Sequence, residues 1–226
     1  ARILSQRDFH PWEGGEGKIT GQYLINLQRR AFDLLKNGQA EQAQALLQQA
    51  LHYPENFGEG RLVGQTDNDL YYWLAVCAEA LNDRTSARDF YQKAAQGSGQ
   101  IGESKYYNDQ PVDYLFYQGM AKAQLGQTQQ AEQIFSQMLD WADKAKDRPF
   151  EADFFAVSLP DLVVLDSDGQ HKHQQHCLFV KTLAYLGQGN TPQFNASLQQ
   201  LLALNPNHDK AHLFSLLGNS LLARGN

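Results

Sequence analysis

Apolar residues recur along this chain with a fixed offset of 44 residues. Each copy has a small residue, a large residue four positions later and an apolar residue three positions after that. The three copies are Ala43, Leu47 and Ala50; Ala87, Tyr91 and Ala94; and Ala131, Phe135 and Met138. Positions i, i+4 and i+7 lie on one face of an α-helix, so each copy is predicted to contain an amphipathic helix.

A second apolar stripe precedes each of these helices at the same offset. The three stripes begin near Leu27, Tyr71 and Leu115 and end at Gly38, Asn82 and Gly126. Gly and Asn are the residues that most readily close a helix in the left-handed conformation. Each unit is therefore predicted to be a helix, a tight turn and a second helix.

These positions resemble the tetratricopeptide repeat, which has large, small, aromatic and turn residues at similar spacing. The third copy is the clearest, with Leu115, Gly119, Gly126, Ala131 and Phe135. A fourth unit begins near His173 and closes with the "ALNPNH" stretch, and one more first helix follows Lys210. The offset exceeds the 34 residues of the family's unit, so about ten extra residues are expected in each connection between units.

The resemblance implies an all-α, right-handed solenoid of about four helix pairs with a C-terminal capping helix and extended inter-repeat loops. The units are expected at about 22–51, 67–95, 111–145 and 173–205, with the cap at 209–224. Residues 1–21 are expected to form an N-terminal extended segment. An insert at about 146–170 contains Phe154, Phe155 and Leu162, and we expect it to pack against the solenoid because it is too apolar for a solvated linker.

A narrower resemblance rests on "YPENFGEGRLVGQTDNDLYYWL" (53–74) and "FFAVSLPDLVVLD" (154–166). Both are similar to the C-terminal repeat region of large bacterial proteins. The N-terminal part of those proteins is uncharacterised, looks β-rich and resembles sugar-handling β-sandwiches. This resemblance is compatible with a chain cut from a longer protein, and it implies no activity.

Composition removes several classes of partner. The formal charge is −6, which provides no basic field for a nucleic acid backbone. Apolar runs are much shorter than the roughly 20 residues that cross a bilayer, so no membrane contact is expected. Cys77 and Cys177 lie in apolar stretches and cannot form a disulfide framework, which favours a reducing, cytoplasmic location.

Three tetrapeptides, GEGK, GEGR and GESK, occur in the loops that precede the first three units. The simplest interpretation is turn chemistry, with the acidic and basic side chains paired locally. The alternative is a polar ledge that binds a ligand or partner through Glu16, Lys18, Glu59, Arg61, Glu103 and Lys105. The spacing does not fit a phosphate-binding loop, which needs Lys-Ser or Lys-Thr after the last glycine.

Metal and catalytic chemistry have little support. His171, His173, His176 and Cys177 are close in sequence, but zinc would need a second ligand cluster, so core and first-turn roles are favoured. The acidic residues of the long insert suit a solvated surface better than a carboxylate pair. We therefore expect no metal, no cofactor and no enzymatic activity.

The concave face is the favoured binding surface, since the first helices of such stacks line a groove that holds an extended peptide. The family's lining positions correspond to Gln28, Phe32, Asp69, Tyr72, Val76, Glu79, Asp113, Phe116, Met120, Lys181 and Tyr185. Burial between helices is the competing interpretation for the aromatic residues, and helix-dipole stabilisation is the competing one for the two aspartates. Acids and aromatics on this face favour a basic, apolar or sugar ligand over an acidic one.

The predicted function is therefore a binding or scaffold module. Its partner would be another protein or peptide, or the N-terminal part of the same polypeptide. The alternative is an accessory carbohydrate-binding region, in which aromatic rings stack on sugars and carboxylates accept hydroxyl hydrogen bonds.

Overall fold

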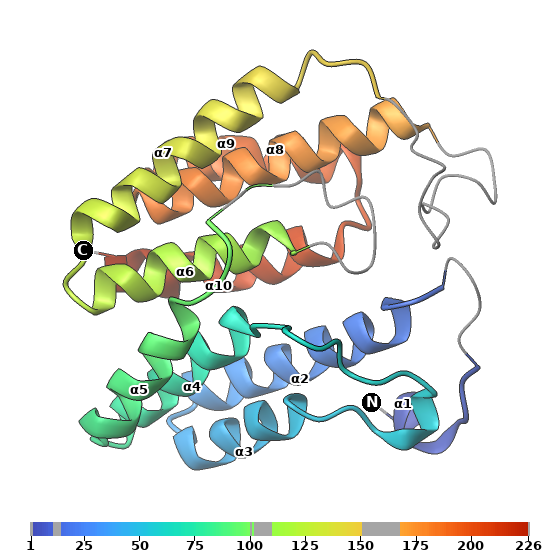
Figure 1. Cartoon of the computed structure of the whole chain (residues 1–226), viewed down its shortest axis with the longest axis vertical. Helices are drawn as coiled ribbons and strands as arrows, with labels where there is room; N and C mark the ends of the chain where they lie inside the picture. The colour runs from blue at the N-terminus through green and yellow to red at the C-terminus, as the bar shows by residue number, and fades with distance from the viewer. Residues whose placement is uncertain (1, 11–14, 100, 102–109, 151–167, 226) are drawn as a thin grey trace.

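The computed structural model describes residues 2–10, 15–99, 101, 110–150 and 168–225. All regular secondary structure in these ranges is helical (Figure 1). The elements are α1 (Arg2–Gln6), α2 (Lys18–Lys36), α3 (Ala40–Ala50), the 3₁₀ helix η1 (Glu55–Phe57), α4 (Asn68–Ala80), α5 (Arg84–Ala94), α6 (Val112–Gln124), α7 (Thr128–Ala145), α8 (Gly169–Gly187), α9 (Thr191–Leu204) and α10 (Asp209–Gly225).

Four helix pairs, α2/α3, α4/α5, α6/α7 and α8/α9, are each joined by a tight turn. The turn residues Gly38, Asn82, Gly126 and Gly189 have φ angles of 72°, 61°, 78° and 69°. These values lie in the left-handed region, where glycine and asparagine are favoured. The first three are the residues at which the sequence predicts the first helix of each unit to end, and that expectation is confirmed.

Successive pairs stack and share one core. Trp73 of α4 donates its indole N–H to the Tyr117 hydroxyl of α6 at 3.1 Å, and these two residues are 44 positions apart. The all-α helical-repeat fold expected from the sequence is thereby confirmed. No helix in the described ranges combines the length and the apolar character that a membrane span requires.

Glycines allow α6 and α8 to approach α7 closely. A Cβ atom built on Gly119 would lie 2.6 Å from the Phe135 ring, and one built on Gly187 would lie 2.3 Å from the same ring. Both distances are shorter than two non-bonded carbon atoms tolerate. The Phe135 side chain, which is 3% exposed, therefore fills the space that the two glycines leave open.

Helix α10 does more than cap the stack. It packs against α8 and α9, as a terminal helix would, but it also contacts α6 and α2. In Figure 1, α6 and α10 lie between the group formed by α7–α9 and the group formed by α2–α5. The last helix thus closes the array back onto its first pair, which a simple capping helix does not do.

The N-terminal segment differs from the expected extended chain. Residues 2–6 form α1, and α2 begins at Lys18, four residues before the predicted start of the first unit. The Phe9 ring packs edge-on against Phe57 at 5.9 Å, and its backbone N–H donates to the carbonyl of Asn56 at 2.8 Å. These contacts fold the segment onto η1. The apolar residues of the predicted insert, including Phe154, Phe155 and Leu162, lie outside the described residues.

Candidate functional site

A cavity of about 880 Å³ lies between α2, the loop before α4, α6 and the start of α10. Its wall mixes carboxylates, amides, two tyrosines and apolar side chains. The lining residues are Glu16, Gly17, Thr20, Gly21, Leu24, Ile25, Gln28, Tyr53, Glu59, Gly60, Leu62, Val63, Gly64, Gln65, Thr66, Asp69, Gln110, Pro111, Asp113, Tyr114, Lys210 and Leu213. Because they span nearly the whole chain, the cavity depends on the closure of α10 onto α2.

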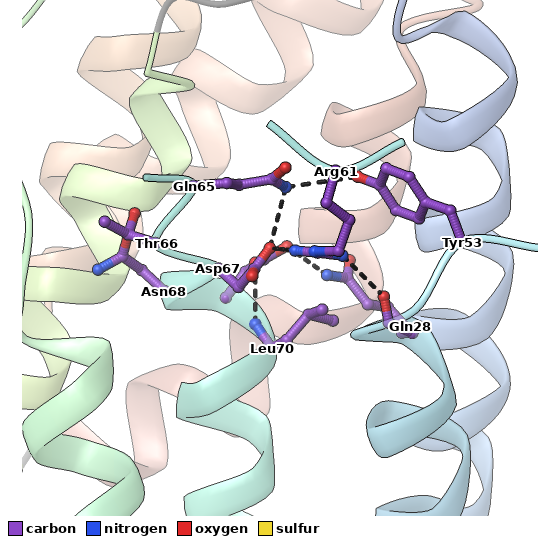
Figure 2. Close-up of polar contacts among 10 residues, drawn as sticks. Gln28, Tyr53, Arg61, Gln65, Thr66, Asp67, Asn68 and Leu70 are labelled. Atoms are coloured by element: carbon purple, nitrogen blue, oxygen red, sulfur yellow. Dashed lines mark hydrogen bonds and ion pairs between the residues drawn. The ribbon is translucent and has the colours of Figure 1, made fainter. Parts of the chain in front are cut away.

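The loop at 58–67 forms one wall and is held by a polar network around Asp67 (Figure 2). The Arg61 guanidinium donates to Asp67 and to the Ala50 carbonyl, and it lies 4.8 Å above the Tyr53 ring. The Gln65 amide donates to Asp67 at 2.9 Å and to the Tyr53 hydroxyl at 3.4 Å. Asp67 is 5% exposed, so this network fixes the wall from inside the fold.

The first two tetrapeptide loops lie side by side at this cavity. The Glu59 carboxylate accepts hydrogen bonds from the Gly17 backbone N–H at 3.3 Å and from the Thr20 hydroxyl at 3.2 Å. Gly17 and Gly58 both have positive φ, of 76° and 66°, which glycine adopts without strain. One glycine of each copy therefore provides a turn, as the simpler interpretation expects.

The residues of the predicted ledge do not share one position. Glu16 and Glu59 line the cavity, whereas Lys18 and Arg61 are absent from its lining and Arg61 is turned toward Asp67. Glu103 and Lys105 lie outside the described residues.

Asp69 and Asp113 are the buried acids of the cavity, and each is 5% exposed. Asp69 accepts from the Gln28 side-chain amide and from the Leu70 backbone N–H, the latter at 2.8 Å. Asp113 accepts from the Lys210 ammonium at 2.5 Å. Helices α2, α4, α6 and α10 thus each contribute one polar side chain to this group, and three of the four residues, Gln28, Asp69 and Asp113, belong to the predicted concave face.

Burial is the main reason that the pKa of Asp69 rises from its usual 3.8 to about 6, and repulsion from Asp113 adds to the rise. The Lys210 ammonium, the Gln28 amide and the Leu70 N–H oppose it. Burial and the two aspartates also hold the pKa of Tyr114 well above its usual 10, so its hydroxyl stays protonated at neutral pH. The cavity therefore combines a costly buried charge with a neutral hydrogen-bonding hydroxyl.

The raised pKa predicts a pH-dependent stability. The folded protein holds the Asp69 proton more tightly than the unfolded chain, so the free energy of unfolding falls as pH rises from 3.8 to about 6. Each pKa unit corresponds to about 1.4 kcal/mol, so the full loss of unfolding free energy is about 3 kcal/mol. Asp69→Asn is therefore expected to stabilise the protein by up to about 3 kcal/mol at pH 7.5 and by close to zero at pH 4. Urea unfolding of both proteins across this range measures the difference, and a gain that does not change with pH would contradict the assignment.

The aromatic and apolar members of the predicted concave face are in the core. Phe32, Tyr72, Val76, Phe116 and Met120 are each at most 5% exposed. The Tyr72 ring packs against Tyr91 at 5.6 Å, and the Phe116 ring packs against Phe214 of α10 at 5.5 Å. Their recurrence at 44 residues reflects the repeated packing between helices, which is the competing interpretation stated for them.

The remaining predicted residues lie apart from the cavity. Glu79 is exposed near the C-terminal end of α4. Lys181 and Tyr185 line a smaller hollow of about 340 Å³ between α7, α8 and α9, where the Lys181 ammonium is 2.8 Å from the Asp143 carboxylate. The eleven predicted positions therefore do not form one continuous surface.

The histidine cluster is built into helix packing. His173 is 7% exposed, and its Nε2 atom lies 2.8 Å from the Ala145 carbonyl oxygen and 3.6 Å from Cys177 Sγ. His176 packs edge-on against Trp141 with ring centroids 5.5 Å apart. Within the described ranges, no group of three or more His, Cys, Asp or Glu side chains is arranged to hold a metal ion.

Sequence reasoning missed Tyr53, Gln65, Tyr114 and Lys210. Tyr53 and Gln65 lie in or beside an inter-repeat connection, where no helical periodicity indicates which way a side chain points. Lys210 occupies the first turn of α10, 97 residues after its partner Asp113. The periodicity of α10 indicates which of its faces is buried but not which helices cover that face.

Comparison with known families supports the repeat assignment. Residues 69–96 and 113–140 match the model of the tetratricopeptide repeat. The first segment covers most of α4 and α5, and the second covers most of α6 and part of α7. No solved structure matches the chain significantly.

Proposed function

We propose that this chain, in which two tetratricopeptide repeats are recognised, is a non-catalytic module that binds a segment of a partner protein in the cavity between α2, α4, α6 and α10. The observation that carries the proposal is the cavity itself. It holds about 880 Å³, enough for several side chains, and it lies where the first helices of three units converge.

Family and surface chemistry both support a protein ligand. Tetratricopeptide repeats generally mediate protein–protein interaction and are typically non-catalytic. The cavity has apolar side chains beside its polar groups, including Leu24, Ile25 and Leu213. At its rim, Leu62 is 43% exposed and Val63 is fully exposed. Exposed aliphatic side chains beside a polar cavity suit a peptide, because a peptide presents polar backbone groups next to apolar side chains.

The proposed partner segment belongs to another protein or to the upstream part of the same polypeptide. Either source presents the same chemistry to the cavity. Adding the upstream polypeptide as a separate chain distinguishes the two, because a segment of the same protein would bind in trans without any further partner.

Carbohydrate is the second candidate, since Tyr53 and Tyr114 line the cavity together with carboxylates. Its support is weaker because sugar stacking needs an open aromatic face. Arg61 covers the Tyr53 ring at 4.8 Å, and Tyr114 is only 6% exposed. Tyr72 and Phe116, two aromatic residues of the predicted concave face, do not line the cavity.

Filling the cavity tests the proposal. Gly21 lies in α2 on the cavity wall, and a Cβ built on it meets no atom within 4 Å. Gly21→Phe is expected to occupy the cavity without disturbing the core, whereas Gly21→Ala leaves most of the space open. Peptides selected from a random 12-residue display library against the wild type should lose at least about tenfold in affinity with Gly21→Phe.

The same peptides should bind Gly21→Ala within about twofold of the wild type. Fluorescence anisotropy measures the affinities, and thermal unfolding verifies that both variants are folded. Failure to select any peptide, or equal affinity for Gly21→Phe and the wild type, would contradict a peptide site in this cavity. Binding of members of a sugar panel that Gly21→Phe abolishes, without peptide binding, would favour the carbohydrate candidate.

A further inference from the structure

The charges around the cavity are unbalanced. The described lining residues include four carboxylates, Glu16, Glu59, Asp69 and Asp113, and a single cationic side chain, Lys210. Arg61, the cation of the loop at 58–67, is engaged with Asp67 outside the lining set. With all groups ionised, the lining carries a net charge of −3, so its electrostatic potential favours a cation over an anion.

One of these carboxylates, Asp113, already pairs with an ammonium group of the protein itself. Lys210 Nζ lies 2.5 Å from Asp113 Oδ1, and its charge also stabilises the ionised form of Asp69. Lys210 belongs to α10, whereas the wall that Asp67 holds in place is the loop at 58–67. The Asp113 carboxylate is thus placed to accept a hydrogen bond from an ammonium group.

Lys210 is placed so that another cation can replace it. Its side chain is 34% exposed, whereas that of Asp113 is 7% exposed. The ammonium therefore approaches from the solvent side of a buried carboxylate. When it leaves, it regains hydration, so displacement costs far less than removal of a fully buried partner.

Building on the proposed function, we infer that the cavity recognises a lysine or arginine side chain of the partner segment, which binds at Asp113 and Asp69 in place of the Lys210 ammonium. Asp113 and Asp69 are the recognition residues, and Lys210 is an internal competitor. A basic residue flanked by apolar ones matches both the acidic floor and the aliphatic rim of the cavity.

The direction in which Lys210→Met changes the affinity for a cationic peptide tests this inference. The probe is a fluorescein-labelled tetralysine peptide, compared with its Nε-acetylated form and with tetraglutamate. Lys210→Met should tighten tetralysine binding by about tenfold, because it removes both competition and repulsion. Asp113→Asn should weaken it by about tenfold, and Gly21→Phe should abolish it. The acetylated peptide and tetraglutamate should bind none of these proteins measurably.

The chain offers a matched control pair. Lys181 and Asp143 form an ion pair at 2.8 Å in the separate hollow between α7, α8 and α9. Lys181→Met and Asp143→Asn change the net charge of the protein by the same amounts as Lys210→Met and Asp113→Asn. They should leave tetralysine affinity within about twofold of the wild type, which separates local recognition from the field of the whole molecule.

Weaker or unchanged tetralysine binding by Lys210→Met would overturn the inference, and so would equal tightening by Lys181→Met. Lys210 is partly exposed, so Lys210→Met remains informative if Asp113→Asn unfolds the protein. The proposed function and this inference can be contradicted by different results. Library peptides that bind in a Gly21-dependent manner but are neutral or acidic would retain the peptide site and reject a cationic ligand.

Discussion

Gly187→Ala is expected to lower the free energy of unfolding by about 1–3 kcal/mol through overpacking. The opposite sign would follow from helix propensity, since alanine is favoured over glycine in a helix by about 1 kcal/mol. Packing decides because the new Cβ would lie 2.3 Å from the ring of Phe135, which Gly119 of α6 also approaches. Phe135 is 3% exposed, so its ring has no solvent-filled space into which it can move. Urea unfolding followed by circular dichroism measures the change.

Two further variants show whether the ring is the cause. Gly21→Ala, where the added Cβ meets no atom within 4 Å, should stabilise the protein by about 0.5–1 kcal/mol. Phe135→Leu in the Gly187→Ala background should recover part of the loss, so that the double-mutant cycle gives a favourable coupling energy. If Gly187→Ala stabilises the protein as Gly21→Ala does, α6, α7 and α8 do not meet at Phe135 as described.

Phe214→Ala is expected to cost about 3–5 kcal/mol, as large-to-small changes of buried aromatic residues do. The Phe214 side chain is 1% exposed. Its ring centroid lies 5.5 Å from that of Phe116, 6.0 Å from that of Tyr117 and 5.9 Å from that of Phe179. The side chain therefore fastens α10 to α6 and α8 together. Chemical denaturation of the variant measures the loss.

Leu216→Ala is the matched control in the same helix. Leu216 is 38% exposed, so the change should cost less than about 1 kcal/mol. Equal, small effects at both positions would mean that α10 is a loosely attached terminal helix, and the cavity it closes would then lose its support.

The repeated pairs could be predicted from the sequence because their determinants are local. Gly38, Asn82 and Gly126 mark turns whose positive φ each residue can adopt alone. The spacing of Ala87, Tyr91 and Ala94 places all three on the buried face of α5, with no knowledge of the neighbouring helices. Such features repeat with the unit, so each copy supports the interpretation of the others.

Only part of the candidate site could be predicted from the sequence, because the site depends on contacts between distant segments. Asp69 and Asp113 could be named from their common helix position. Lys210, which pairs with Asp113 and lowers the pKa of Asp69 through its charge, could not. The side chains of Gln22 and Asp209, which join α2 to α10 at 2.5 Å, are 187 residues apart and carry no pattern that links them.

Aromatic residues show a second limit of sequence reasoning. Tyr72 and Phe116 occupy positions that suit a groove wall, yet both are fully buried in the core. Helical spacing indicates that such side chains share a face. It does not distinguish a face covered by the protein's own helices from one left open for a ligand, because both environments favour the same residues.

Hydrogen exchange on the complex with the tightest-binding selected peptide tests the central claim most directly. The account predicts slower amide exchange in 17–25 and 58–66, at the start of α2 and in the loop before α4, where residues line the cavity. It predicts no change in α5 and α9, which contribute no lining residue. Protection confined to α7–α9 around Lys181 and Tyr185, with none at 58–66, would place the partner in the smaller hollow and contradict the account.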